Sequence, residues 1–467
     1  MKLLISAYAC APNRGSDHAV GWNWATEAHR LGHEIWAFVS PAHHDSIKRA
    51  CDEIPGLDGI HWVFPEVKGW PLKQAVEPKW ERTYNVLWQR AALRDARDLH
   101  QQVGFDVVHH LTWAGIRAPT FLGALAAPLI IGPVGGGETS PPSLRDEIGL
   151  RGRILEGIRD LSNSTIAMNP LVRSGLARAS VIFVSTADTQ NLFKGALRNK
   201  ATVFTQLGLP NLPSGRLPRS SSGPPRFLYA GRLLYWKGVH IAIRAFAEVV
   251  RQIPNARFTI VGSGPERSRL EDDIRHNKLL GSVEFIPQLP QNALFELYRN
   301  HDLFLFPSLH DSGGFVVLEA MSHGLPVVCL DLGGPRDMVT PSSGVVVKHN
   351  GQNSAQLATM MAQEVCRLLA SPEKLAVLSA GAVARAQDFI LAERIKRFYD
   401  RAMEFMPAGA HSTETFHEEC SDLTDSGRTR SSNGSVRAGG SRTISVGSTA
   451  SDDLCGGAED HANVHQD

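Results

Sequence analysis

Two carboxylates, Asp311 and Glu319, lie eight positions apart in the sequence, with the pair Gly313-Gly314 between them. A short apolar run, 303–306, precedes this segment, and a helix-like run that stops at Gly324 follows it. The pattern predicts a strand, a glycine-rich turn and a helix, with Asp311 before the helix and Glu319 inside it. The free N–H groups of a helix N-terminus suit a phosphate. The alternative is an ordinary turn with a capping Asp and a solvated Glu.

Two cations, Arg232 and Lys237, lie five positions apart across another strand-to-helix turn, which begins at Gly231. Arg offers a planar fork of donors and Lys offers a point charge, so the two together suit a diphosphate. The alternative is a pair of solvated cations without a ligand.

A third turn of this kind contains Gly262 and Gly264, which allow a close approach of the backbone to a ligand. A dinucleotide-binding fingerprint needs a third glycine where this chain has Arg267. The sequence therefore does not support NAD binding or a dehydrogenase. A further glycine turn, 331–335, is expected to be structural.

Two loops in the first half of the chain follow predicted strands. The first contains Gly15, Ser16 and Asp17 and is expected to face a ligand across a cleft. The second, 135–138, contains Gly136 and Glu138 and lacks the Lys-Ser/Thr pair of a triphosphate-binding loop, so a kinase or ATPase is not supported. The alternative for this second loop is a flexible connection that only lets two domains close.

Strand-like and helix-like runs alternate along both halves, which predicts α/β domains with parallel, doubly wound sheets. Ligands bind at the carboxyl ends of the strands in such sheets, so the expected site is a cleft between two domains. Strands are expected at 3–7, 34–39, 60–64, 107–109, 129–132, 181–184, 226–230, 257–261, 283–286, 303–306, 327–330 and 345–347. Helices are expected at 18–31, 76–103, 150–179, 186–196, 237–252, 265–278, 291–299, 315–323, 352–369 and 391–406.

The composition excludes several classes of protein. The 467 residues carry 48 basic and 47 acidic side chains, so no charge excess points to nucleic acid. The six cysteines form no CxxC pair, which is typical of a reducing compartment. No stretch approaches the ~18 apolar residues of a membrane-spanning helix, and the apolar run at the N-terminus is too short for a signal peptide. We therefore expect a cytoplasmic protein.

Several motifs occur together, in this order: Gly231-Arg232…Lys237-Gly238, Val261-Gly262-Ser263-Gly264-Pro265, Pro307-Ser308 and Asp311-x7-Glu319-Ala320-Met321. The set resembles the retaining glycosyltransferases of family four, also called group 1 glycosyltransferases. The segments 6–24 and 132–138 look like a bacterial branch of that family in which surface polysaccharide assembly is a common role. The resemblance implies a GT-B fold, with two Rossmann-like doubly wound domains facing across a cleft and a C-terminal helix that crosses back.

The resemblance also implies a division of the chain. Residues 1–207 would form the N-terminal Rossmann-like acceptor domain, 208–225 a hinge or linker, and 226–390 the C-terminal nucleotide-sugar donor domain. Residues 391–406 would form the crossover helix. The segment 407–467 is rich in Ser, Thr, Gly and Asp, so it is expected to be a disordered tail, with a docking segment as the alternative.

The resemblance assigns a role to each matching residue. Arg232 and Lys237 would neutralise the donor diphosphate, Glu319 would bind the ribose hydroxyls, and Asp311 would contact the sugar ring. Because these two cations stabilise the leaving diphosphate, no metal and no cofactor is expected. Backbone contacts to the donor are expected from Gly15, Gly231, Gly262, Gly264, Gly313, Gly314, Phe315 and Val316.

Two departures from the family pattern affect these roles. Asp311 stands where the family usually has Glu, which is one methylene longer. The family's functional His would fall at Leu111, whereas this chain has adjacent His109 and His110. Neighbouring strand residues point to opposite faces, so one of them is expected to face the cleft, and we favour His110 as the catalytic one. His109, with Gly136 and Glu138, is assigned to the acceptor side. The alternative is that both are ordinary packed histidines.

The segment 145–178 carries six arginines among Ile, Leu and Met. Such a pattern suits an amphipathic face that contacts a lipid-linked acceptor or the inner face of a membrane as a peripheral protein. A solvated basic face is the alternative.

The sequence thus predicts a retaining, metal-independent glycosyltransferase that moves a sugar from a UDP- or GDP-sugar to a saccharide or lipid-linked saccharide. The expected setting is surface polysaccharide biosynthesis. Two other functions stay open. One is a nucleotide-sugar epimerase on the same fold, which would need no acceptor. The other is a non-catalytic glycan-binding or scaffold protein.

Overall fold

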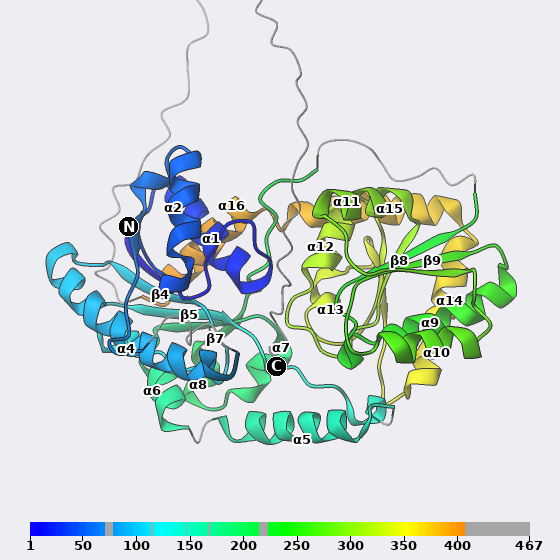
Figure 1. The fold of residues 1–467 in the computed structure, drawn as a ribbon, viewed down its shortest axis with the longest axis horizontal. Coiled ribbons are helices and arrows are strands. Elements are labelled where there is room, and N and C mark those ends of the chain that lie inside the picture. Colours follow the sequence, from blue (N-terminus) through cyan, green and yellow to red (C-terminus); the bar gives the residue numbers. More distant parts are fainter. Residues whose placement is uncertain (71–77, 114, 146, 167–168, 214–222, 407–467) are drawn as a thin grey trace, which may run out of the picture. The chain divides into compact units, whose positions relative to one another are not determined.

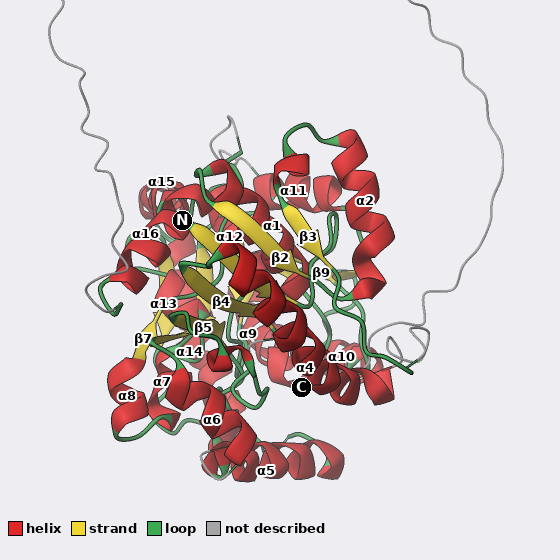
Figure 2. Ribbon diagram, turned by 90° about the vertical axis from the view of Figure 1, so that its left-hand side faces the viewer, coloured by secondary structure: helices red, strands yellow, loops and turns green. Residues whose placement is uncertain are grey.

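The computed structural model describes residues 1–406 with the exception of 71–77, 114, 146, 167–168 and 214–222. The expected disordered tail, 407–467, lies outside the described residues. The described part contains two parallel sheets with helices packed around them (Figures 1 and 2).

The first sheet has seven strands in the order β3-β2-β1-β4-β5-β6-β7, and every neighbouring pair is parallel. The chain steps outward from β1 to β3 and then returns to β4 beside β1, which is the strand order of a doubly wound sheet. Its strands are β1 (Lys2–Ala7), β2 (Glu34–Phe38), β3 (His61–Val63), β4 (Val107–Thr112), β5 (Leu129–Val134), β6 (Val181–Val184) and β7 (Ala201–Val203).

The second sheet repeats this arrangement with six parallel strands in the order β10-β9-β8-β11-β12-β13. Its central strands are continuous apolar runs whose residues are all buried, as expected for strands covered on both faces. The strands are β8 (Arg226–Ala230), β9 (Arg257–Val261), β10 (Val283–Ile286), β11 (Leu303–Phe306), β12 (Val327–Leu330) and β13 (Gly344–Val347).

Helices connect the strands in both halves. Those of the first half are α1 (Ser16–Arg30), α2 (His44–Glu53), α4 (Pro78–Val103), α5 (Leu150–Ser164), α6 (Pro170–Arg178), α7 (Ala187–Leu192) and α8 (Ala196–Lys200). Those of the second half are α9 (Val239–Gln252), α10 (Arg267–His276), α11 (Gln291–Asn300), α12 (Phe315–Ser322), α13 (Pro335–Met338), α14 (Ser354–Leu369) and α15 (Pro372–Gln387), followed by α16 (Leu391–Met403). Two doubly wound α/β units therefore follow each other, as the sequence predicted.

The last helix, α16, leaves the second half and packs on the first. The ring of Phe398 lies 4.8 Å from that of Trp24 in α1 and 4.2 Å from that of Phe183 in β6. Tyr399 is hydrogen-bonded through its hydroxyl to His109 of β4, at 3.0 Å. Figure 1 shows α16 beside α1, while α15 lies near α12. The crossover helix expected from the sequence is confirmed.

Two helices expected from the sequence are each divided in the structure. The expected helix 150–179 is α5 and α6, because Asn169 caps α6 with its side chain and Pro170 occupies the first turn. The expected helix 186–196 contains α7 and only the first residue of α8, because Gly195 adopts a φ of 56° between them. The rest of α8 was not expected.

Other elements were not expected. These are α2, α13 and α15, of which α13 and α15 begin with a proline in the first turn, and the edge strand β7. The strand β4 runs to Thr112 and not to residue 109, so both His109 and His110 lie inside it.

Candidate functional site

The predicted glycine turns meet at one edge of the second sheet. The strands β9, β8, β11 and β12 are neighbours, and each runs in the same direction. The turns that follow them therefore lie at the same carboxyl edge. This edge carries the two predicted cations after β8 and the predicted carboxylate Asp311 after β11.

Lys237 and Asp311 form an ion pair between Nζ and Oδ2. Their side chains are only 19% and 15% exposed. The other carboxylate oxygen of Asp311 accepts a hydrogen bond from the N–H of Gly313 at 3.3 Å, and its carbonyl accepts one from Gly334 at 2.7 Å. The structure thus brings the turns after β8, β11 and β12 into direct contact around one residue, Asp311.

Arg232 lies at the same edge and is exposed. Within the described residues its guanidinium has no hydrogen-bond or ion-pair partner. The turn beneath it is fixed, because the buried Tyr229 donates its hydroxyl to the carbonyl of Arg232 at 3.1 Å. A guanidinium on a fixed turn, beside a lysine that already has a counter-ion, is available to an anion.

The glycines of the third turn allow the turns after β8 and β9 to touch. A Cβ on Gly262 would lie 1.9 Å from the carbonyl oxygen of Gly231, and a Cβ on Gly264 would lie 2.4 Å from that of Leu233. Both glycines also have positive φ angles, 149° and 157°. Neither position accepts a side chain, so these two residues set the close packing of the site's backbone.

The helix α12 begins at Gly314, which has a φ of 115° and gives no side-chain cap. Among the described residues, the N–H groups of Phe315 and Val316 have no hydrogen-bond acceptor. They are the free donors that a helix N-terminus offers to an anion. These are the two residues to which the resemblance assigned backbone contacts with the donor.

Glu319 lies in the next turn of α12. Its carboxylate accepts hydrogen bonds from Gln291 at 3.1 Å and from the hydroxyl of Tyr298 at 3.2 Å. Burial raises the pKa of Glu319, while these two hydrogen bonds act in the opposite direction. The carboxylate is thus held in one orientation by two neighbours.

The loop 135–138 of the first half lies against the Asp311 segment. A Cβ on Gly135 would be 3.0 Å from Ser312, which shows how closely the two backbones approach. Glu138 points inward and is 3% exposed. Its carboxylate accepts hydrogen bonds from the hydroxyls of Thr186 and Thr189 and from the N–H of Gly136. These contacts hold the loop in place.

The two adjacent histidines point to opposite faces of the first sheet and are both buried. His109 contacts the crossover helix and the carbonyl of Gly132, at 2.7 Å from Nε2. His110 lines a small cavity with Thr120 and Val172, and its Nε2 has no partner among the described residues. Burial lowers the pKa of His109 to about 4 and, with repulsion from His109, that of His110 to about 3. Both rings are neutral near pH 7.

Gly15 precedes α1 in the loop after β1, and it is exposed with open space around its Cα. Asp17, two residues later, accepts a hydrogen bond from the backbone N–H of Trp113, which follows β4. Burial raises the pKa of Asp17. The loop therefore lies at the carboxyl edge of the first sheet, where the sequence placed it.

The sequence did not single out a polar cluster around Glu156. This carboxylate, in α5, is 1% exposed and is hydrogen-bonded to His310 at 3.1 Å and to the hydroxyl of Tyr235. Its other oxygen accepts the N–H of Ser140. Tyr235 and His310 flank Lys237 and Asp311 in the sequence, so the cluster joins the first half of the chain to the predicted diphosphate site. The one sequence signal that could have indicated this cluster is an acidic residue, Glu156, within an arginine-rich helix.

The described residues contain no group of three or more His, Cys, Asp or Glu side chains placed to hold a metal ion. Of the helices in this part of the chain, none combines the length and apolar character needed to cross a bilayer.

Residues 218–382 match the family model described as glycosyl transferases group 1. The glycogen synthase of Mycobacterium tuberculosis is 32% identical over 169 residues, which is 35% of this chain and 40% of that protein. A D-inositol 3-phosphate glycosyltransferase from Thermobispora bispora is 32% identical over 249 residues, or 50% of this chain and 54% of that protein. The chain thus spans about half or less of the length of these relatives.

The whole described fold also has solved counterparts. Anabaena HepE, solved in complex with UDP and with UDP-glucose, superimposes with TM-scores of 0.55 and 0.54 at 18% identity, covering 86% of this chain and 100% of HepE. The fold is therefore GT-B. The match to the model of the group 1 glycosyltransferases lies in the second half of the chain.

Proposed function

We propose that this protein is a retaining, metal-independent glycosyltransferase that moves a sugar from a UDP- or GDP-sugar to a saccharide or lipid-linked saccharide. One observation carries the proposal. The exposed guanidinium of Arg232, the Lys237–Asp311 pair and the free N–H groups at the start of α12 all lie at one carboxyl edge of a group 1 glycosyltransferase domain.

The chemistry follows from where charge develops. Breaking a glycosyl–phosphate bond builds positive charge on the sugar and negative charge on the diphosphate. Arg232 and Lys237 then stabilise the leaving diphosphate, and the N–H groups of Phe315 and Val316 add fixed dipoles. Glu319 accepts hydrogen bonds from the ribose, and Asp311 accepts them from the sugar ring. The acceptor hydroxyl attacks on the face from which the diphosphate leaves and gives its proton to the departing diphosphate, which retains the configuration.

The remaining assignments complete this proposal. Residues 1–207 form the acceptor domain and 226–390 the donor domain, with 208–225 as the hinge. Gly15 and Gly136 approach the donor and acceptor from the first domain, and His110 supplies a neutral imidazole on that side. The proposed location of this enzyme is the cytoplasm, and its proposed role is in surface polysaccharide biosynthesis. The UDP-glucose complex of the similarly folded HepE makes UDP-sugars the first donors to try.

The first test is binding. The melting temperature of the purified full chain would be followed with UDP, GDP, ADP and their common sugar conjugates, in the presence of EDTA. We expect a rise with one nucleotide family, since a ligand that binds the native state stabilises it. No rise with any nucleotide in a well-folded sample would contradict the proposal and favour a non-catalytic glycan-binding protein.

The second test separates a transferase from an epimerase. The nucleotide sugar that binds would be incubated with and without candidate acceptors, and the products would be analysed. With an acceptor, a transferase releases the nucleoside diphosphate and forms a new glycoside. Without an acceptor, it forms no glycoside and at most hydrolyses the donor slowly. Conversion of the donor to its epimer without release of nucleotide would establish the epimerase instead.

A specific observation favours a lipid-linked acceptor at a membrane surface. Five large apolar side chains of α5 are between 40% and 76% exposed, and Figures 1 and 2 show this helix at the margin of the described structure. They are Leu150, Ile154, Leu155, Ile158 and Leu161. A cavity of about 200 Å³ near the end of the helix combines the apolar Phe193 with the cations Arg173 and Lys194. Apolar side chains next to cations suit an anionic lipid surface.

This contact can be measured by sedimentation with vesicles. We expect the protein to pellet with vesicles that contain phosphatidylglycerol and not with phosphatidylcholine alone. The double variant Ile154→Gln/Ile158→Gln should stay in the supernatant, whereas Val377→Gln, an exposed apolar residue on α15, should behave like the wild type. Equal behaviour of all three proteins would contradict the membrane contact.

A further inference from the structure

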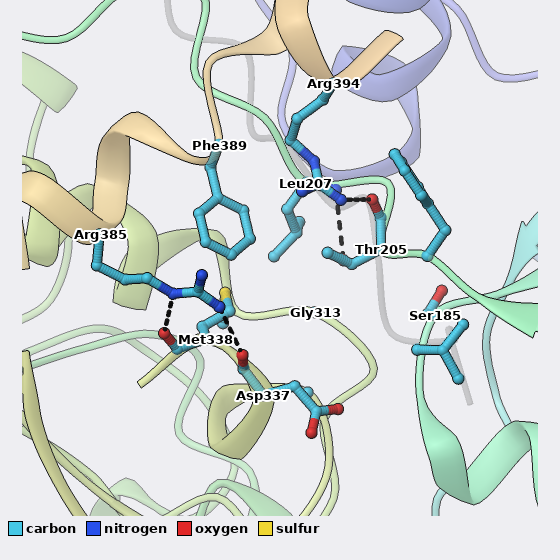
Figure 3. A pocket seen from close by; sticks show the side chains of 12 residues that line it. Ser185, Thr205, Leu207, Gly313, Asp337, Met338, Arg385, Phe389 and Arg394 are labelled. Atoms are coloured by element: carbon cyan, nitrogen blue, oxygen red, sulfur yellow. Dashed lines mark hydrogen bonds between the residues drawn. The ribbon is translucent and has the colours of Figure 1, made fainter. Parts of the chain in front are cut away.

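A second cavity borders the turns that hold Asp311, where the end of the first half meets the crossover segment. It has a volume of about 220 Å³ and is shown in Figure 3. Its lining comes from the segment 203–207, from the turns after β11 and β12, and from the segment that joins α15 to α16. Its charged lining residues are Asp337, Arg385 and Arg394.

Arg394 is the residue whose contacts are incomplete. Its Nη2 donates to the carbonyl of Thr205 at 2.8 Å, but its buried Nε has no acceptor among the described residues. The guanidinium lies between two phenyl rings, 4.4 Å from the centroid of Phe204 and 4.9 Å from that of Phe389. No carboxylate in the described structure pairs with it. The rings cover its faces and leave the donors at its edge to be satisfied.

Arg385 lies on the other side of the Phe389 ring, as Figure 3 shows. Its donors reach the carbonyls of Met338 and Asp337 and the carboxylate of Asp388. Burial lowers the pKa of Arg394 to about 10, and repulsion from Arg397 and Arg385 adds to this effect. Arg394 is therefore charged near pH 7 in a basic environment. Attraction to Asp388 partly offsets this repulsion. No carboxylate among the described residues contacts the guanidinium, so an anion in the cavity would supply the missing partner.

We propose that this cavity binds a small oxyanion, a phosphate or carboxylate group on a small molecule, through Arg394. The apolar Leu207, Met338 and Phe389 would surround the body of the ligand, and Ser185 adds a hydroxyl at the opposite side. This site is additional to the proposed donor site, with which it shares only Gly313 among the predicted residues.

The position of the cavity gives the anion a consequence. Its lining includes Ser185 and Thr205 of the first half, Gly334 and Met338 of the second, and Arg394 of the crossover helix. A ligand that fills it contacts all three and joins them. An anion bound there therefore stabilises this arrangement of the two halves.

The test is anion binding to the full chain without nucleotide. Melting temperature would be followed against inorganic phosphate and, separately, acetate, with sodium chloride at equal ionic strength as the reference. The Arg232→Ala variant serves as the background, because it removes a cation of the proposed donor site. We expect stabilisation by phosphate or by acetate beyond that by chloride, and the stronger of the two identifies the group that the cavity prefers. Stabilisation by neither anion overturns the proposal.

Two further substitutions locate the site. Arg394→Gln should lower the affinity at least about tenfold, the size of one charge-assisted hydrogen bond. Arg401→Gln is the matched control, since Arg401 lies on the same helix, is exposed and does not line the cavity. Unchanged anion binding by Arg394→Gln, or equal loss in both variants, overturns the proposal.

A gain-of-affinity variant covers the case in which Arg394→Gln fails to fold. Asp337 lines the cavity and carries the only charge there that opposes an anion, among the residues described. Asp337→Asn should raise the anion affinity several-fold because it removes this repulsion. An affinity equal to that of the wild type counts against the site. Because no turnover is measured, these results stand even if the protein transfers no sugar.

Discussion

At the scale of single residues, the ion pair between Lys237 and Asp311 means that the lysine is already neutralised before any ligand binds. A diphosphate must compete with Asp311 for it. The variant Asp311→Asn is therefore expected to bind a free nucleoside diphosphate more tightly than the wild type, while turnover of the nucleotide sugar falls because the contact to the sugar ring is lost. Calorimetric titration with the diphosphate and a steady-state assay with the sugar donor measure the two effects.

The control for this variant is Asp331→Asn, which removes a carboxylate that follows β12 and pairs with the exposed Lys348. It should change neither quantity much. If Asp311→Asn weakens diphosphate binding as strongly as it weakens turnover, Asp311 does not compete with the diphosphate for Lys237. The proposed competition is then wrong.

Within the described part of the chain the guanidinium of Arg232, unlike the ammonium of Lys237, has no partner to lose. Arg232→Ala is expected to leave the melting temperature unchanged and to lower kcat/KM by about 1.5–3 kcal/mol, the range for a hydrogen bond to a charged group. This corresponds to roughly a 10- to 150-fold loss, since ~1.4 kcal/mol is tenfold. The exposed Arg251 of α9 provides a control variant. Near-normal turnover of Arg232→Ala would remove the diphosphate assignment from this residue.

At the scale of elements, the site depends on turns that touch. Gly262→Ala would place a Cβ 1.9 Å from the carbonyl oxygen of Gly231, so the turn after β9 must move away from the turn that carries Arg232. We expect a loss of several kcal/mol in the free energy of unfolding, above the ~1 kcal/mol that a positive φ alone costs. Denaturant unfolding measures this difference.

A matched variant separates the steric clash from the backbone angle. Gly281 also has a positive φ, 81°, but nothing lies within 4 Å of a Cβ built there. Gly281→Ala should therefore lose only the smaller amount. Equal losses in the two variants would mean that the close approach of the turns does not matter for stability.

The same turns explain how far the sequence could predict the fold. The strands β8, β9, β11 and β12 were located to the residue, because each is a short apolar run that ends at a glycine or proline signal. The break between α5 and α6 was missed although Asn169-Pro170 is a start signal, since the apolar periodicity continued through it. Helix α15 also begins with a proline, which is a start signal, and it was missed as well.

In the candidate site, too, some residues could be predicted from local sequence signals and others could not. Arg232, Lys237, Asp311 and Glu319 could be grouped from the sequence because parallel strands bring their carboxyl ends to one edge. The contact of Glu156 with His310 could not be predicted, since it joins residues 154 positions apart whose neighbours carry no local signal. The burial of Glu138 by Thr186 and Thr189 is of the same kind.

At the scale of the whole molecule, side chains of the first half reach the second at several points. The Glu156 cluster is the most buried of these contacts. Others are the bond of Ser143 to His349 at 3.0 Å and the salt bridge of Arg336 with Asp188 at 3.0 Å. Exposed ion pairs contribute little to stability. The buried carboxylate of Glu156 is therefore expected to dominate the stability of this contact.

Acid should weaken the contact of Glu156 over a defined range of pH. Burial alone would raise the pKa of Glu156, but hydrogen bonds from His310 and Tyr235 outweigh burial and lower the pKa to about 2. A depressed carboxyl pKa stabilises the folded state above the ordinary value of 4.5, and this contribution is lost as the pH falls from 4.5 toward 2. The shift corresponds to about 3 kcal/mol at neutral pH.

Glu156→Gln tests this contribution. The variant should melt several degrees below the wild type at pH 7, and the difference should shrink steadily as the pH is lowered below 4.5, because the wild type loses what the variant never had. Asp272→Asn is the control, since Asp272 pairs with Arg275 at the surface and is 71% exposed. A gap between Glu156→Gln and the wild type that stays constant from pH 7 to pH 3 would mean that the carboxylate charge of Glu156 does not hold the two halves together.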